Sequence, residues 1–226
     1  MKKFELTNIT MTFEGKKLYR IRALKDFPSG NPIVLKDSLG GWVESEFNLS
    51  QNGNCWIYNE AKVMDSAAVS DNAEVEWECI VRGNAKVYGN AKIRDNAIIS
   101  DSAEAFGNCS IYNNAAAANN SKIFGNCQVY GNSRVESSGR ICGSAQILED
   151  SISRGDIFGS VIIRNASVIP TIIEEGSRIF GRGIFLGCTI GRGSIVNGYG
   201  SEYWLLNLYD REYISSSTLP LRSLFT

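Results

Sequence analysis

The sequence contains no histidine, and this absence limits the chemistry that its 226 residues can perform. Histidine is the most frequent general base in enzymes because its ordinary pKa lies near neutral pH. A general base in this chain would have to be a carboxylate instead. Glu74, Glu76 and Glu104 are candidates, but each also has the simpler interpretation of an ordinary charge on a solvated face.

Long apolar runs, paired cysteine motifs and an excess of one charge are also missing. No stretch approaches the roughly 18 apolar residues of a membrane-spanning helix, and we expect no signal peptide because the first lysines precede no long apolar segment. The six cysteines form no CxxC pair, which favours buried thiols in a reducing, cytoplasmic compartment. With 23 basic and 24 acidic residues, general attraction to nucleic acid or membranes is not expected.

The chain does contain a repeat with a period of six. From Cys55 to Ser151, every sixth residue is small, without exception. Two positions after the small residue, all but three of the units carry Ile or Val, and two positions before it all but three carry Gly, Asn or Asp. Such a fixed period is the mark of a repeat architecture.

Each unit reads as a short strand followed by a corner. Small and aliphatic residues two positions apart point to the same side of a strand, and Gly, Asn or Asp tolerates the left-handed backbone of a turn. Three successive units therefore close one triangular coil. We predict an all-β fold, a parallel β-helix of about eight coils and roughly 40 Å in length. Positions 18 apart should then stack, which predicts an asparagine ladder through Asn54, Asn72, Asn90, Asn108 and Asn126.

Three regions are predicted from this pattern: an N-terminal β cap at 1–50, the β-helix at 51–197 and a C-terminal cap at 198–226. Caps are expected because an open β-helix end would aggregate. The first region reads as a hairpin with Glu14 and Gly15 at its turn, and the last as a hairpin or short helix. The repeat blurs after Arg154, and we expect further coils with small insertions near Pro170 and Cys188.

The outward positions fall on three faces of the predicted prism. The first face, from Trp56 and Tyr58 onward, is mixed and indicates a solvated surface. The second is weakly polar and the third carries stacked aromatic residues, so both suit a subunit contact. The predicted interface residues are Met64, Ile80 and Ile98 on the second face and Tyr88, Phe106 and Phe124 on the third. A base-stacking platform for nucleic acid is not expected there because Glu104 interrupts the basic charges.

The later coils are rich in arginine, whereas the early coils are acidic. This polarity predicts a site for a small anionic ligand at Arg164, Arg178, Arg182 and Arg192, with Arg154 nearby. No phosphate-binding loop or dinucleotide motif is present, and we expect no metal and no cofactor. A cysteine nucleophile would need a base and an accessible, electropositive setting. Four cysteines occupy inward positions, which argues against this role, and Cys142, the only outward one of the regular repeat, reads as incidental.

The segment "LGGWVESEFNLSQNGNCWIYNEA", Leu39 to Ala61, and the six-residue units after it resemble a group of uncharacterised bacterial and phage-encoded hexapeptide-repeat proteins. The resemblance covers roughly residues 15–155. It implies a left-handed β-helix, often trimeric, in a cytoplasmic setting. Some members are labelled as transferases, and hexapeptide-repeat acyltransferases typically use a histidine as general base.

Two functions follow from these observations. The first is a non-catalytic scaffold or binding protein, a homotrimer that binds a partner protein or a small anionic ligand. One version, which the resemblance allows, is a phage-encoded factor directed at a host protein or a signalling nucleotide. The alternative is an acyltransferase-like enzyme in which a carboxylate replaces the missing histidine.

Overall fold

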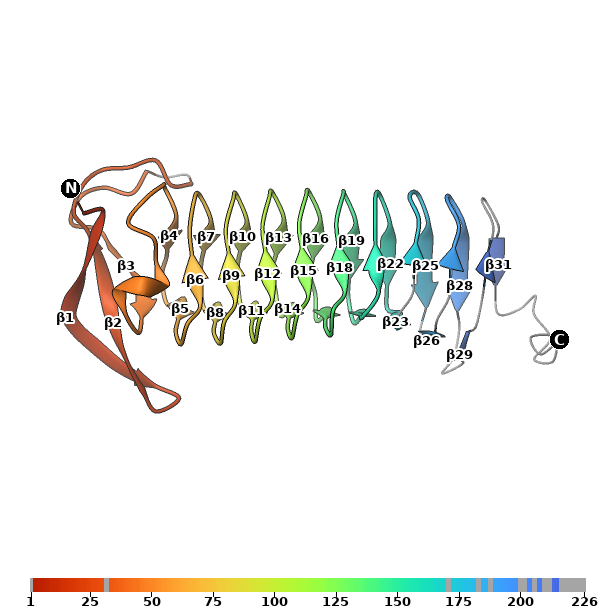
Figure 1. Ribbon diagram of the computed structural model, residues 1–226, viewed down its shortest axis with the longest axis horizontal. Coiled ribbons are helices and arrows are strands. Elements are labelled where there is room, and N and C mark those ends of the chain that lie inside the picture. Colours follow the sequence, from red (N-terminus) through yellow and green to blue (C-terminus); the bar gives the residue numbers. More distant parts are fainter. Residues whose placement is uncertain are drawn as a thin grey trace.

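The computed structural model describes residues 2–30, 33–169, 172–181, 184–186 and 189–198, and the strands at 203–204, 207–208 and 213–215. These residues form an elongated stack of short parallel strands with an antiparallel hairpin at its N-terminal end (Figure 1). One 3-10 turn, η1 (Glu46–Asn48), is the only helical element in the described part of the chain. The predicted all-β, parallel β-helix of about eight turns is confirmed.

The strands fall into three sheets, which form the three faces of the prism. Face 1 comprises β4 (Trp56–Ile57), β7 (Glu74–Val75), β10 (Lys92–Ile93), β13 (Ser110–Ile111), β16 (Gln128–Val129), β19 (Gln146–Leu148), β22 (Ile162–Arg164), β25 (Arg178–Gly181), β28 (Ile195–Gly198) and β31 (Tyr213–Ser215). Face 2 comprises β3 (Leu39–Val43), β5 (Lys62–Val63), β8 (Ile80–Val81), β11 (Ile98–Ile99), β14 (Ala116–Ala117), β17 (Arg134–Val135), β20 (Ile152–Ser153), β23 (Ser167–Ile169), β26 (Ile184–Leu186) and β29 (Tyr203–Trp204). Face 3 comprises β6 (Ala68–Val69), β9 (Lys86–Val87), β12 (Glu104–Ala105), β15 (Lys122–Ile123), β18 (Arg140–Ile141), β21 (Asp156–Ile157), β24 (Ile172–Ile173), β27 (Thr189–Ile190) and β30 (Asn207–Leu208).

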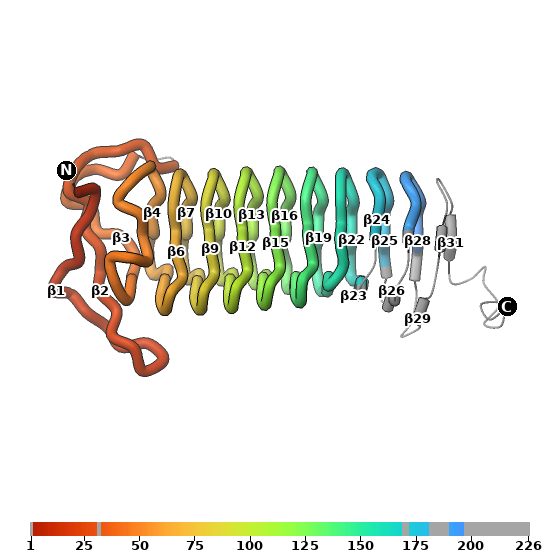
Figure 2. The backbone as a smooth tube through the Cα atoms, viewed as in Figure 1, coloured from red at the N-terminus to blue at the C-terminus, as the bar shows by residue number. Residues whose placement is uncertain are grey.

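The regular coils keep the predicted period of three units per lap. Lys92 pairs with Glu74 on the coil before it and with Ser110 on the coil after it, each three units away along the chain. Figure 2 traces these successive laps side by side. The aliphatic residue of each unit, such as Val87 or Ile93, is fully buried inside the prism. Apolar burial along the whole axis therefore supplies the core.

Three corners connect the faces: the first leads from face 3 to face 1, the second from face 1 to face 2, and the third from face 2 to face 3. The predicted asparagine ladder runs along the first corner, where Asn72 Nδ2 donates to Asn90 Oδ1 at 3.1 Å and Asn90 Nδ2 donates to Asn108 Oδ1 at 2.9 Å. A second ladder, which the sequence analysis did not identify, joins Asn96, Asn114 and Asn132 along the second corner.

At Gly107, on the first corner, both the backbone conformation and the available space favour glycine. Gly107 has a φ of +75°, and a Cβ atom added there would lie 2.9 Å from the amide nitrogen of Gly125 on the next coil. A side chain would be strained in this left-handed conformation and would press on the neighbouring backbone. The coils can stack at strand spacing because this position carries no side chain.

Most coils after Arg140 become shorter, so the expectation of small insertions near Pro170 and Cys188 was wrong, although the lap from Ile184 to Tyr203 is longer than the regular period. Arg140 pairs with Asp156, and Ile152 pairs with Ser167, so both partners come earlier in the chain than the regular period would place them. The missing residues come from corners, because the strands keep their pairing on all three faces. Most of the shortening falls on the third corner, where only Arg154 and Gly155 separate β20 from β21.

The predicted N-terminal hairpin is confirmed. Strands β1 (Phe4–Phe13) and β2 (Lys16–Ala23) pair in antiparallel fashion across Glu14 and Gly15, and β2 continues onto β3. Strand β3 already pairs in parallel with β5, so the prism begins before residue 51. Phe4 and Phe27 pack edge-on against Trp56. Face 1 is therefore not solvated at its first coil, since residues of the N-terminal segment bury Trp56.

At the other end, strands β29, β30 and β31 pair in parallel with the coil before them. Within these strands the segment predicted as a C-terminal cap continues the prism instead of forming a hairpin or helix. Most of the remaining residues of 198–226 lie outside the described ranges. In the part of the chain that the structure describes, no helix is long and apolar enough to cross a membrane.

Candidate functional site

The predicted interface residues of face 2 differ in accessibility. Met64 is only 1% exposed and packs with Leu18 and Trp42 under the N-terminal hairpin of the same chain. It is therefore not available for a contact between subunits. Ile80 is half-buried at the margin of that cluster, and Ile98 lies one coil further on, beyond it. The part of face 2 that remains accessible begins at these two coils.

On face 3, the predicted aromatic stack is present. The rings of Tyr88 and Phe106 are 4.8 Å apart and those of Phe106 and Phe124 are 4.9 Å apart, with planes parallel to within 3°. Each inner ring covers its neighbour's face, so the stack presents ring edges to solvent. Both faces of the Phe106 ring are therefore covered by its neighbours.

The arginines predicted to bind an anion do not all meet. Arg164 and Arg178 project from neighbouring strands of face 1, and Arg164 forms an ion pair of 3.2 Å with Glu149. Arg192 lies at the first corner, which leads into the same face, and Arg182 lies outside the described residues. Arg154 lies apart from them at the third corner.

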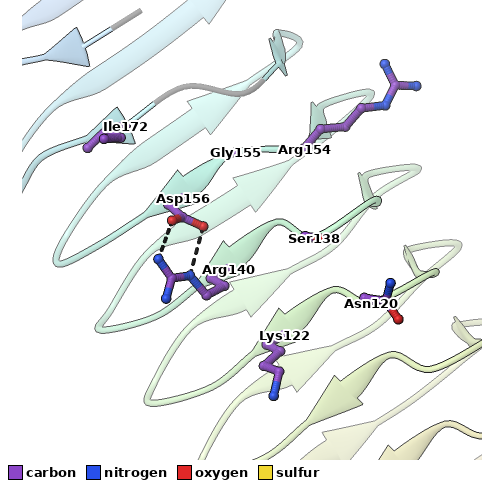
Figure 3. Close-up of a pocket in the computed structure, with 8 residues that line it drawn as sticks. All are labelled: Asn120, Lys122, Ser138, Arg140, Arg154, Gly155, Asp156 and Ile172. Atoms are coloured by element: carbon purple, nitrogen blue, oxygen red, sulfur yellow. Dashed lines mark hydrogen bonds and ion pairs between the residues drawn. The ribbon is translucent and has the colours of Figure 1, made fainter. Parts of the chain in front are cut away.

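The clearest hollow is at that third corner, where the coils shorten (Figure 3). The regular corner before it, Glu136 to Gly139, has four residues, whereas the next one has only Arg154 and Gly155. The cavity beside this shortened corner has a volume of 720 Å³. The lining consists of Asn120, Lys122, Ser138, Arg140, Arg154, Gly155, Asp156 and Ile172.

Three of these eight lining residues are cations, and one is an anion. Lys122 and Arg140 extend from neighbouring strands of face 3, while Arg154 projects from the truncated corner, away from the Arg140–Asp156 pair (Figure 3). Arg140 donates from Nε to Asp156 Oδ1 at 3.0 Å and from Nη2 to Oδ2. Lys122 and Arg154 are paired with Glu104 and Glu136, at 3.3 and 3.0 Å, and these carboxylates are not part of the lining.

The ion pair between Arg140 and Asp156 fixes the charge of both groups. Hydrogen bonds from Arg140 lower the pKa of the Asp156 carboxyl, and the same bonds raise the pKa of the Arg140 guanidinium. Asp156 is therefore ionised at neutral pH but is a weak base. The hollow offers a fixed, mainly positive surface and lacks a strong proton acceptor among its described lining residues.

The three candidate bases named from the sequence lie elsewhere. Desolvation opposes ionisation of Glu104, but hydrogen bonds from Tyr88 and Lys122 outweigh it and lower the pKa of this carboxyl. Glu76 is the opposite case, because burial, reinforced by a hydrogen bond with Glu74, raises its pKa. Glu74 and Glu76 project from face 1 near the N-terminal end, many coils away from the third-corner hollow.

The sequence analysis missed Lys122 and Arg140 as a site. Regular spacing makes both look like any other outward residue of the repeat. The signal that could have identified the site is the distance along the chain between successive strands. The next strand usually begins five positions after the last residue of a strand, but Asp156 follows Ser153 by only three positions. That shortened unit marks where the corner is truncated.

Comparison with known proteins gives one limited relationship. An 84-residue stretch is 33% identical to a protein named "Uncharacterized acetyltransferase YdcK" from Escherichia coli (strain K12), and it covers 33% of this chain and 24% of that protein. The match thus spans about a quarter of the relative's length. No family model matches the chain. Together with the regular laps of three six-residue units, the similarity supports a hexapeptide-repeat β-helix fold.

Proposed function

We propose that this protein is a non-catalytic β-helix that binds a small phosphate-bearing ligand in the third-corner hollow. The observation that carries the proposal is the truncated corner, because it opens a cavity beside Lys122, Arg140 and Arg154. Lysine and arginine are the side chains that bind phosphate most often, and arginine can do so with two parallel hydrogen bonds. The cavity volume also lies within the range typical of small-molecule sites.

Both main cations keep donors for such a ligand. Arg140 uses Nε and Nη2 for Asp156, which leaves the other terminal nitrogen free to donate. The Lys122 ammonium has three donors and a single ion pair to Glu104. Asn120 and Ser138 add polar side chains at the rim of the hollow. A phosphate would be held by charge and by several hydrogen bonds at once.

Acetyl transfer is the alternative function, and the printed name of the E. coli relative favours testing it. The chain has no histidine, and the carboxylate in the hollow is a weak base because Arg140 holds its pKa low. The carboxyl with a raised pKa, Glu76, lies on another face. These features favour binding without catalysis.

A homotrimer and a cytoplasmic setting belong to the same proposal. The surface around Ile98 on face 2 and around Tyr88 and Phe106 on face 3, on the coils before the hollow, would form the subunit contact. A partner protein could use the same surface. The cysteines that the structure describes are all unpaired, which supports a reducing compartment.

Isothermal titration with ribose 5-phosphate tests the proposal. We expect binding to the wild-type protein and a loss of at least tenfold in affinity for Lys122→Ala and for Arg140→Ala. Lys86→Ala is the matched control, because Lys86 belongs to the same column of face 3 but does not line the hollow. It should bind as the wild type does.

Two results would overturn the proposal. The first is no binding of ribose 5-phosphate at millimolar concentration. The second is acetyl transfer from acetyl-coenzyme A that is lost in Glu76→Gln or Asp156→Asn, which would establish the catalytic alternative.

A further inference from the structure

The aromatic stack of face 3 is interrupted next to the hollow. Its outward column continues from Phe124 to Cys142 and then to Phe158, because Ile123 pairs with Ile141 and Ile141 pairs with Ile157. The backbone confirms these levels, since Phe124 N donates to Ile141 O and Cys142 N donates to Ile157 O. Cys142 therefore stands between Phe124 and Phe158 in a column that is aromatic at all its other levels from Tyr88 to Phe158.

The interruption has the dimensions of one flat ring. Neighbouring coils are about 4.8 Å apart, so the backbone positions of Phe124 and Phe158 are separated by two such steps, roughly 9.6 Å. The rings within the existing stack are 4.8 and 4.9 Å apart. A ring placed over Cys142 would meet Phe124 on one face and Phe158 on the other at the spacing the protein already uses.

This slot adjoins the proposed phosphate site. Phe124 is two residues from Lys122, Cys142 is two residues from Arg140, and Phe158 is two residues from Asp156, so slot and cations form parallel columns on one face. The Arg140 guanidinium lies 5.6 Å from the centre of the Phe158 ring. Phe158 is 36% exposed, which is unusual for a phenyl side chain.

We propose that the slot over Cys142 binds the flat ring of a ligand whose phosphate occupies the third-corner hollow, and thus that the ligand class is a nucleoside phosphate or a similar ring-bearing phosphate ester. The inference rests on the proposed function and specifies its ligand. Arg140 leaves the Phe158 ring when the ligand enters and turns its free donor toward the phosphate. Phe106 has a ring neighbour on both sides, whereas Phe124 has no ring at the next level, where Cys142 stands.

The test compares AMP with ribose 5-phosphate, which lacks the base. Stacking a base on aromatic side chains contributes about 1–3 kcal/mol, so we expect AMP to bind about tenfold more tightly, or better. In Cys142→Phe the new ring completes the stack and fills the slot. AMP affinity should fall to that of ribose 5-phosphate, while ribose 5-phosphate binding is unchanged.

A matched control exists at the other end of the same column. Ser70 lies opposite Tyr88 on the preceding coil, so Ser70→Phe also lengthens the stack by one ring, far from the slot. AMP binding to this variant should equal that of the wild type. Phe158→Ala removes one of the two rings that border the slot and does not fill it. This variant should reduce the difference in affinity between AMP and ribose 5-phosphate. It replaces Cys142→Phe as the test if that variant does not fold.

The outcomes separate the two proposals. If ribose 5-phosphate binds and AMP binds no better, or if Cys142→Phe and Phe158→Ala both retain the AMP advantage, the slot is refuted and the phosphate site stands. If neither compound binds, the proposed function itself fails. If the advantage is lost equally in Ser70→Phe, it arises from the stack as a whole, and the slot is again refuted.

Discussion

The side chain of Lys3 is fully buried, and its Nζ donates a hydrogen bond of 2.9 Å to the carbonyl oxygen of Cys55. In this fold the N–H groups of each coil donate to carbonyl groups of the next coil, as Asn54 N does to Asp71 O. The carbonyl groups of the first coil therefore have no coil before them. Lys3 meets this need, and its Nζ also lies 3.5 Å from the carbonyl oxygens of Asn52 and Gly53.

We predict that Lys3→Met destabilises the protein. The substitution keeps the aliphatic stem but leaves the buried Cys55 carbonyl without a donor, which costs about 1–3 kcal/mol. Lys2→Met is the control, since the exposed ion pair of Lys2 with Glu46 should contribute less than about 1 kcal/mol. Urea unfolding measures both, and equal midpoints would contradict the role given to Lys3.

The free energy of unfolding should fall in proportion to the number of hydrogen bonds removed from the asparagine ladder. Asn90→Ala deletes two side-chain hydrogen bonds, to Asn72 and Asn108, whereas Asn54→Ala deletes the single bond at the end of the ladder. We expect a loss of about 1 kcal/mol for Asn90→Ala and about half of that for Asn54→Ala. Thermal unfolding monitored by circular dichroism tests the order, and a larger loss for Asn54→Ala would refute it.

Trp77 is a poor fit to its corner. It has a φ of +64° and is 55% exposed, at a position where most other coils carry Gly, Asn or Asp. A left-handed conformation costs a residue with a Cβ atom about 1–2 kcal/mol. We predict that Trp77→Gly is more stable than Trp77→Ala by about 1 kcal/mol. Both variants lose the indole, so their difference in urea midpoint isolates the backbone effect, and equal midpoints would contradict it.

Glu76 should make stability depend on pH. Burial and the neighbouring Glu74 raise its pKa in the folded protein above the ordinary 4.5, so the folded state binds more protons than the unfolded state just above that pH. The contribution of Glu76 is thus fully present below pH 4.5 and is lost as the pH rises through its folded pKa. Relative to wild type, Glu76→Gln should become more stable as the pH is raised from about 4 to about 7.

Urea unfolding at a series of pH values measures this difference, with Glu78→Gln at the exposed second corner as the control. A difference between Glu76→Gln and wild type that stays constant over the range would show that the carboxyl is not perturbed by folding.

The repeat itself could be predicted because its signal is local. A small residue every six positions and Ile or Val two positions later determine the strand, the corner and the closing of three units into one lap. The stacking of Asn72 on Asn90 followed directly from that period, and the structure confirms it. The turn of the N-terminal hairpin was equally local, since Glu14 and Gly15 separate two alternating strands.

Features that depend on the path of the chain could not be predicted in this way. Met64 reads as an outward residue, and only the way the hairpin folds back along face 2 shows that Leu18 and Trp42 cover it. The sequence shows that the six-residue period is lost near Arg154. An inserted residue and a deleted residue disturb the period in the same way, so the sequence alone does not show which of the two occurred. Strand pairing decided between them, because Arg140 pairs with Asp156 rather than with a later residue.

Restoring the missing corner tests the central claim most directly. Inserting two serines between Arg154 and Gly155 rebuilds a four-residue corner like Glu136 to Gly139, fills the hollow and leaves Lys122, Arg140 and Asp156 in place. The measurement is isothermal titration of this variant with ribose 5-phosphate, after circular dichroism has shown an intact β fold. We predict a loss of binding of at least tenfold, whereas wild-type affinity in the folded variant would contradict a ligand site at the truncated corner.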